Sequence, residues 1–149
     1  MELEELYPKQ ELIIENLKSQ NISTPLFSLD GLTTYGKIVY VYDGDSCDIV
    51  LYIDNLGFRR FKCRINGIDC AEKRSANPEE RSYALKALNF VSRLLDTIVT
   101  IRCYKFDKYG RLLIDIFDNN VSLAEQLIEQ KLAYRYNGKT KKMFNEWKM

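Results

Sequence analysis

Three charged residues, Arg64, Asp69 and Glu72, stand within nine positions at the end of one predicted strand. The strand is predicted because apolar and polar residues alternate up to Ile65, the pattern of a half-buried β-strand. Charged side chains are rarely buried unless they are paired or bound to a metal. An arginine and two carboxylates could together bind a divalent cation, activate a water molecule and hold a phosphate. A polar loop after an edge strand is the plainer interpretation, and this segment alone favours it.

A second acidic motif, Asp43-Gly44-Asp45, follows an earlier predicted strand. Asp and Gly both favour tight turns, so the motif could be an ordinary turn. It also places two carboxylates near the end of a strand, and oxygen ligands are those that a hard cation such as Ca²⁺ requires.

Arg111 and two tyrosines offer further candidate contacts. Arg111 follows a predicted hairpin turn, where it could simply be solvated, but a planar guanidinium there would also suit two oxygens of a phosphate. Tyr134 and Tyr136 could cover the core, or they could offer a stacking face and a hydroxyl to a nucleotide.

The chain contains no histidine, which excludes His-based triads, His-ligated metals and a His general base. Any acid–base chemistry must therefore use carboxylate, lysine, tyrosine, cysteine or metal-bound water.

Length and composition favour one globular domain. The chain has 149 residues, of which 46% are hydrophobic and 29% charged, values typical of a soluble protein with a real core. No apolar run is long enough to span a membrane, and the acidic start does not resemble a secretory signal. We therefore expect an intracellular protein whose four cysteines are reduced.

The net charge of +1 is unevenly distributed. Residues 1–33 carry six acidic and two basic residues, whereas the remainder carries 20 basic and 15 acidic residues, a net charge of +5. Much of the excess lies beyond residue 130, and a positive domain with a basic tail suits a polyanion, although solvated tails often look the same.

Strand and helix patterns indicate an α+β fold. The sequence pattern predicts a three-stranded meander over residues 37–42, 48–53 and 58–65. A helix that starts at Asn77-Pro78 is predicted to follow it. Strands over 98–104 and 112–117 and a helix capped by Ser122 complete the pattern. This order fits a five-stranded Greek-key barrel of the OB type packed with two to three helices. Residues 2–20 predict an amphipathic helix, and residues 1–33 are taken as an extension with a linker.

Four motifs in this order resemble the staphylococcal (micrococcal) nuclease family: Asp-Gly-Asp-Ser, Arg-x-x-x-x-Asp-x-x-Glu, Asp-Lys-Tyr-Gly-Arg and Ala-Tyr-x-Tyr. The resemblance covers Tyr35 to about Tyr136. From it we expect residues 34–149 to form a nuclease-like domain. It implies an OB-type barrel that cuts DNA and RNA with Ca²⁺ and leaves 3′-phosphate ends. Cys70 and Ala71 stand where the family usually has Thr and Pro.

The resemblance also implies roles for individual residues. The family's direct Ca²⁺ ligands correspond here to Asp45, Asp69 and the backbone carbonyl of Cys70. The family's carboxylate that reaches the metal through water corresponds to Asp43. Glu72 matches the residue that orients or deprotonates the attacking water, and Arg64 and Arg111 match the arginines that clamp the phosphate. The positions at which the family contacts the nucleotide correspond here to Lys108, Tyr109, Tyr134 and Tyr136.

These features together predict a monomeric, Ca²⁺-dependent endonuclease acting on DNA and RNA without a membrane partner. A non-catalytic OB module that binds single-stranded nucleic acid is the alternative. The N-terminal helix could dock a partner protein in either case, and its apolar stripe predicts that it packs on the barrel away from the cleft. The Cys70 thiol is expected to stay neutral beside the cation site or to fill the barrel as a small apolar group.

Overall fold

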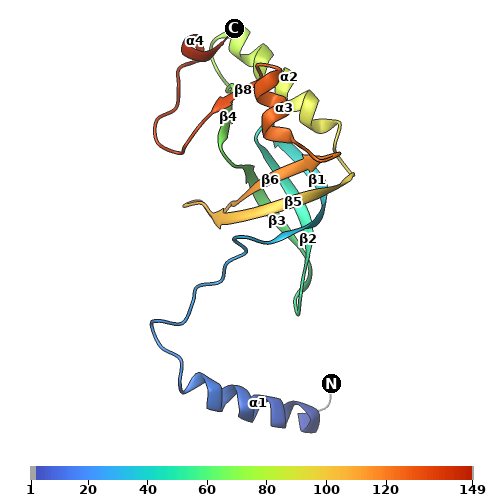
Figure 1. The fold of residues 1–149 in the computed structure, drawn as a ribbon, viewed down its shortest axis with the longest axis vertical. Helices are drawn as coiled ribbons and strands as arrows, with labels where there is room; N and C mark the ends of the chain where they lie inside the picture. Colours follow the sequence, from blue (N-terminus) through green and yellow to red (C-terminus); the bar gives the residue numbers. More distant parts are fainter. Residues whose placement is uncertain (1–2, 149) are drawn as a thin grey trace.

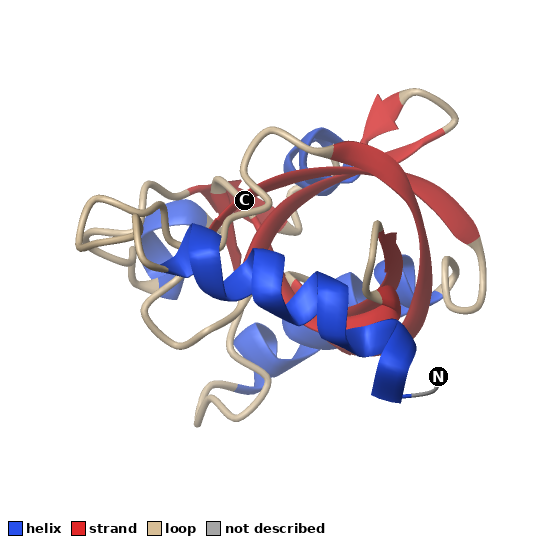
Figure 2. Ribbon diagram, turned by 90° about the horizontal axis from the view of Figure 1, so that it is seen from below, coloured by secondary structure: helices blue, strands red, loops and turns tan. Residues whose placement is uncertain are grey.

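The computed structural model describes residues 3–148, with side chains described from residue 9 onward. Its centre is a barrel of five strands, with the helices of residues 78–147 gathered at one end (Figure 1). The barrel strands are β1 (Thr33–Asp43), β2 (Ser46–Ile53), β3 (Gly57–Ile65), β5 (Ile98–Phe106) and β6 (Leu112–Asp118). They lie in the order β3-β2-β1-β5-β6 with antiparallel neighbours, and a parallel pairing of β3 with β6 closes the ring seen in Figure 2. The predicted α+β fold with a five-stranded OB-type barrel is confirmed.

The barrel closes because each strand has one apolar face that turns inward, and because a small residue stands where two strands lie very close together. The fully buried interior side chains include Ile38, Ile49, Ile65, Ile101, Ile114 and Ile116. Burying one such side chain contributes about 1.5–3 kcal/mol. Gly36 in β1 is required, because a Cβ there would lie 2.8 Å from side-chain carbons of both Ile49 and Leu51. The cysteines form no disulfide, and all four are buried.

Two helices, α2 (Pro78–Ser92) and α3 (Leu123–Glu129), begin at the predicted caps. The Asn77 side chain accepts from the backbone N–H of Glu79 at 2.9 Å, and the Ser122 hydroxyl accepts from that of Glu125 at 3.4 Å. Such caps satisfy N–H groups that the helix itself leaves unpaired. Lys131, just after α3, has a φ of 61°, the left-handed conformation that usually favours glycine.

Four short elements were not predicted from the sequence. They are the strands β4 (Ile68–Cys70), β7 (Val121–Ser122) and β8 (Ala133–Arg135) and the helix α4 (Phe144–Trp147). β4 and β8 form a separate antiparallel pair in which Asp69 lies opposite Tyr134. Segments of two to four residues are too short to show a periodic pattern, so the sequence could not reveal them.

The N-terminal helix α1 (Leu3–Leu17) runs without a break through Pro8, and residue 2 of the predicted range lies outside the described residues. The prediction that this helix packs on the barrel is wrong. Leu12, Ile13 and Leu17 are 55–64% exposed, and α1 stands apart from the barrel in Figure 1. The C-terminal helix α4, in contrast, is packed on the fold, with Phe144 buried against Tyr83.

The segment before β1 already belongs to the barrel. Leu29 is buried in the main core, and the backbone N–H of Gly31 donates to the carbonyl of Cys103 at 2.9 Å. The division into residues 1–33 and 34–149 as separate units stays a prediction. No helix within residues 3–148 is long and apolar enough to cross a membrane.

Candidate active site

One cavity of about 260 Å³ at the helical end of the barrel collects the predicted metal-binding and catalytic residues. They come from the β1–β2 turn, β3, β4, the loop after β4 and the β5–β6 turn. The residues on its wall include Asp43, Asp45, Arg64, Asp69, Cys70, Glu72 and Arg111. Positions up to 68 residues apart in the chain therefore meet at one place, although the roles assigned to them stay predictions.

Arg64 forms the centre of the site by binding two buried carboxylates. Its Nη1 lies 2.9 Å from Asp45 Oδ2, and its Nη2 lies 3.2 Å from Asp69 Oδ1. Burial acts to lower the pKa of the guanidinium, but the two carboxylates outweigh it and raise that pKa. Removing one member would leave a buried charge uncompensated, at a cost of about 3–5 kcal/mol. The three side chains are thus held firmly in place.

Gly44 allows the acidic turn to lie directly against α2 and β4. A Cβ on Gly44 would stand 2.6 Å from the Cβ of Ala87 and 2.9 Å from the Sγ of Cys70, closer than real atoms approach. The small residues at positions 44 and 87 therefore bring the two aspartates of the turn up to Asp69. The backbone N–H of Cys70 donates to Asp45 Oδ2 at 3.3 Å and fixes this contact.

The Cys70 side chain is part of the apolar core, with the residue only 6% exposed. Burial, followed by the nearby charges of Asp45 and Asp69, raises the pKa of its thiol well above the ordinary value. A thiol with a raised pKa stays protonated at neutral pH, as expected. Of the two interpretations of Cys70, the small apolar filler is the one that this packing supports.

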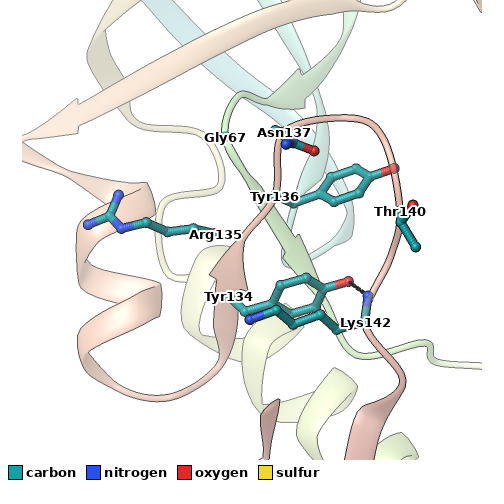
Figure 3. A pocket seen from close by; sticks show the side chains of 7 residues that line it. All are labelled: Gly67, Tyr134, Arg135, Tyr136, Asn137, Thr140 and Lys142. Atoms are coloured by element: carbon teal, nitrogen blue, oxygen red, sulfur yellow. Dashed lines mark hydrogen bonds between the residues drawn. The ribbon is translucent and has the colours of Figure 1, made fainter. Parts of the chain in front are cut away.

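Tyr134 holds the second oxygen of Asp69. Because the two residues lie opposite each other in the β4–β8 pair, the Tyr134 hydroxyl reaches Asp69 Oδ2 and donates to it at 2.8 Å. The same hydroxyl accepts from the backbone N–H of Lys142 at 3.0 Å (Figure 3). Burial, followed by the bond to Asp69, raises the pKa of Tyr134. Tyr134 is only 6% exposed, and its predicted contact with substrate stays a prediction.

Asp107 fixes the hairpin that carries Arg111. Its Oδ1 accepts from the backbone N–H groups of Tyr109 and Arg111, both at 2.9 Å, and its Oδ2 accepts from Arg111 Nε at 2.8 Å. Burial acts to raise the pKa of Asp107, but these three bonds outweigh it and lower that pKa. Among residues 9–148, no group accepts from the two terminal nitrogens of Arg111, which leaves them available to a ligand.

A groove of about 830 Å³ adjoins the cavity and shares Arg64 and Arg111 with it. Lys108, Tyr109 and Tyr136 line this groove, and Tyr109 is 73% exposed. The guanidinium of Arg64 lies 5.8 Å from the centre of the Tyr136 ring. Three of the four predicted substrate contacts therefore lie along one basic, aromatic surface beside the cavity.

Two lysines at the site were not predicted from the sequence. Lys141 Nζ lies 3.4 Å from Glu72 Oε1 and 3.6 Å from Asp69 Oδ1, and Lys73 Nζ lies 3.3 Å from Asp43 Oδ1. In the sequence, Lys141 was only one residue of a basic tail, and nothing in its spacing linked it to Glu72. Basic side chains separate the carboxylates, and within the described part of the chain no three acidic or thiol groups converge into a preformed metal cluster.

Comparison with known proteins shows which family the chain is similar to. The model of the staphylococcal nuclease homologue family matches residues 62–148, more than half of the chain. The chain belongs to this family. The match includes Arg64, Asp69, Glu72 and Arg111, and the Asp43-Gly44-Asp45 turn lies before it.

Two relatives of this chain are described only as uncharacterized proteins. One, from Methanocaldococcus jannaschii, is 32% identical, and the match covers 68% of this chain and 57% of the relative. The other, a 38.1 kDa protein of Capnoides sempervirens, is 26% identical, and the match covers 60% of this chain and 25% of the relative. This family member therefore spans between a quarter and just over half of the length of these relatives.

The donor groups of this family member fit a hard divalent cation. The side-chain groups on the cavity wall that could bind a metal are carboxylate oxygens and the hydroxyl of Ser46, since the chain has no histidine and the Cys70 thiol lies in the core. Ca²⁺ takes six to eight oxygen ligands and tolerates irregular geometry. Asp45 and Asp69 lie near each other on this wall, since Arg64 contacts both carboxylates.

Proposed function

We propose that this protein is a Ca²⁺-dependent endonuclease that hydrolyses phosphodiester bonds of DNA and RNA and leaves 3′-phosphate ends. The observation that carries the proposal is the meeting of four carboxylates with Arg64 and Arg111 on one cavity wall. Carboxylates alone would repel a phosphodiester, and arginines alone would only bind it. Their combination supports both cation binding and phosphate binding, and membership of the nuclease family agrees with it.

In this proposal Asp45, Asp69 and the backbone carbonyl of Cys70 bind Ca²⁺ directly, and Asp43 binds it through water. When bound, the cation would lower the pKa of water and neutralise charge on phosphate oxygens. The protein keeps Asp69 oriented for this role through the hydroxyl of Tyr134 and keeps Asp45 oriented through the backbone N–H of Cys70.

Glu72 is the proposed general base. Its side chain is 64% exposed and lines the cavity, so it can reach a water molecule there. An ordinary glutamate, with a pKa of about 4.3, is a weak base at neutral pH. It would suffice here because a cation bound in the same cavity would make the water easier to deprotonate.

The two arginines are proposed to bind the phosphate as its negative charge rises in the five-coordinate state. Arg111 presents its two terminal nitrogens, because its Nε is occupied by Asp107. Arg64 lies on β3, the strand that pairs with β6 next to Arg111, and would exchange its contacts with Asp45 and Asp69 for phosphate oxygens. Each such contact to developing charge typically contributes about 100-fold or more to the rate.

The groove beside the cavity is proposed to bind the neighbouring nucleotides. Tyr109 offers an exposed ring for stacking, and Lys108 Nζ lies 5.3 Å from the centre of that ring. Stacking on an aromatic face is tolerant of sequence, which suits an enzyme that acts on both DNA and RNA.

Two substitutions test the assignment of roles. We expect Glu72→Gln and Arg111→Ala each to reduce Ca²⁺-dependent cleavage by about 100-fold or more. Matched controls are Glu129→Gln and Arg59→Ala, which replace exposed residues of the same types outside the cavity. Circular dichroism should show that all four variants remain folded.

Near wild-type cleavage by a folded Glu72→Gln or Arg111→Ala variant would contradict the role of that residue. Binding of single-stranded DNA without cleavage by the wild-type protein would instead identify a non-catalytic OB module.

A further inference from the structure

The segment that follows β8 folds back over the candidate site and places a lysine among its carboxylates. Lys141 lies on this segment, residues 137–143, and its Nζ is within 4 Å of both Asp69 and Glu72. Its side chain is only about half exposed although lysines normally extend into solvent. The ammonium therefore occupies the space between a proposed metal ligand and the proposed general base.

A second contact joins the same segment to the same ligand. The backbone N–H of Lys142 donates to the Tyr134 hydroxyl, which in turn donates to Asp69 Oδ2. Figure 3 shows residues 137–142 passing beside the rings of Tyr134 and Tyr136. Both carboxylate oxygens of Asp69 are thus linked to the segment, one through Lys141 and the other through Tyr134.

The segment is anchored beyond Lys142 by α4. Trp147 packs on Tyr134, with ring centres 5.0 Å apart, and Phe144 is buried beside it. Lys141 is therefore held over the site from both sides rather than resting there as a free surface chain.

We propose that Lys141 is an internal cation between Asp69 and Glu72 that competes with the divalent metal for Asp69, so that metal binding releases residues 137–143 from the site. The inference rests on the proposed metal role of Asp69. An ammonium and a divalent cation cannot share these carboxylates at close range, because like charges repel strongly where water is partly excluded. The competition weakens metal binding and links it to the position of the segment.

Calcium affinity of the Lys141→Met variant tests the competition. Isothermal titration calorimetry should show that this variant binds Ca²⁺ about tenfold more tightly than the wild-type protein. The matched control is Lys139→Met, since Lys139 lies on the same segment and forms no ion pair with any described carboxylate. It loses the same charge and should bind Ca²⁺ like the wild type.

Equal affinity in the three proteins, or weaker binding by Lys141→Met, would overturn the competition while the metal role of Asp69 stands. Absence of Ca²⁺ binding in all three would remove the metal role and the competition with it.

Release of the segment has a separate readout. Endoproteinase Lys-C, which cuts after lysine, should cleave the wild-type chain after Lys139 faster in Ca²⁺ than in EDTA, as mass spectrometry of the fragments would show. A ligand that binds only the folded state stabilises that state, so acceleration at this one bond would be specific to the release of the segment. Equal or slower cleavage there in Ca²⁺ would overturn the release.

Discussion

The hydroxyl of Tyr134 offers the sharpest test of how the site is held together. Tyr134→Phe removes one oxygen from a buried position and leaves the ring in place. The change breaks two hydrogen bonds, the donation to Asp69 Oδ2 at 2.8 Å and the acceptance from the Lys142 N–H at 3.0 Å. Asp69 is 4% exposed, so water cannot easily replace the lost donor.

The expected loss of stability follows from these contacts. A hydrogen bond to a charged group contributes about 1.5–3 kcal/mol, and a buried acceptor left unsatisfied costs a similar amount. We therefore expect the free energy of unfolding to fall by about 2 kcal/mol. For a chain of this size each kcal/mol shifts the melting temperature by about 2–4 °C, so Tm should fall by about 4–8 °C.

The assay is urea and thermal unfolding in EDTA, with Tyr136→Phe as the matched control. Tyr136 lies two residues further along, and its hydroxyl forms no hydrogen bond with the described residues. Tyr136→Phe should change the free energy of unfolding by less than about 0.5 kcal/mol. Equal stability of the two variants would refute the inference that the Tyr134 hydroxyl holds Asp69.

Two further predictions concern the β5–β6 hairpin and the N-terminal extension. Folding lowers the pKa of Asp107, so this residue stabilises the protein above its unfolded pKa of about 3.9, and that contribution is lost as pH falls through the folded value. Asp107→Asn should therefore be less stable than the wild type at pH 7, and the difference in unfolding free energy should shrink below about pH 4; a constant difference would contradict this. Deletion of residues 1–24 should leave Tm unchanged, because Leu12, Ile13 and Leu17 are more than half exposed, and a clear fall in Tm would show that α1 packs on the barrel.

Much of the fold could be predicted because its signals are local. The barrel strands show β-branched and aromatic residues in alternation, and the two main helices begin at Asn77 and Ser122, whose side chains cap them as expected. These features depend on a few neighbouring residues, so the sequence alone displays them. The grouping of Asp45, Arg64 and Asp69 was predictable for a different reason, since it came from motifs that occur together in a known family.

The contacts that depend on distant residues could not be predicted. Tyr134 reaches Asp69 only because β4 and β8 pair, and each of these strands has three residues. Lys141 reaches Glu72 across 69 positions of sequence through a loop with no periodic pattern. The exposed position of α1 was missed because an apolar stripe predicts burial but does not identify the surface that provides it.

Digestion of supercoiled plasmid by the purified protein tests most directly whether the cavity of Asp45, Asp69, Glu72 and the two arginines cleaves phosphodiester bonds. We expect cleavage in Ca²⁺, weaker cleavage in Mg²⁺ because that ion demands stricter octahedral geometry, and none in EDTA. Full activity in EDTA, or intact plasmid in Ca²⁺, would contradict a calcium-dependent nuclease.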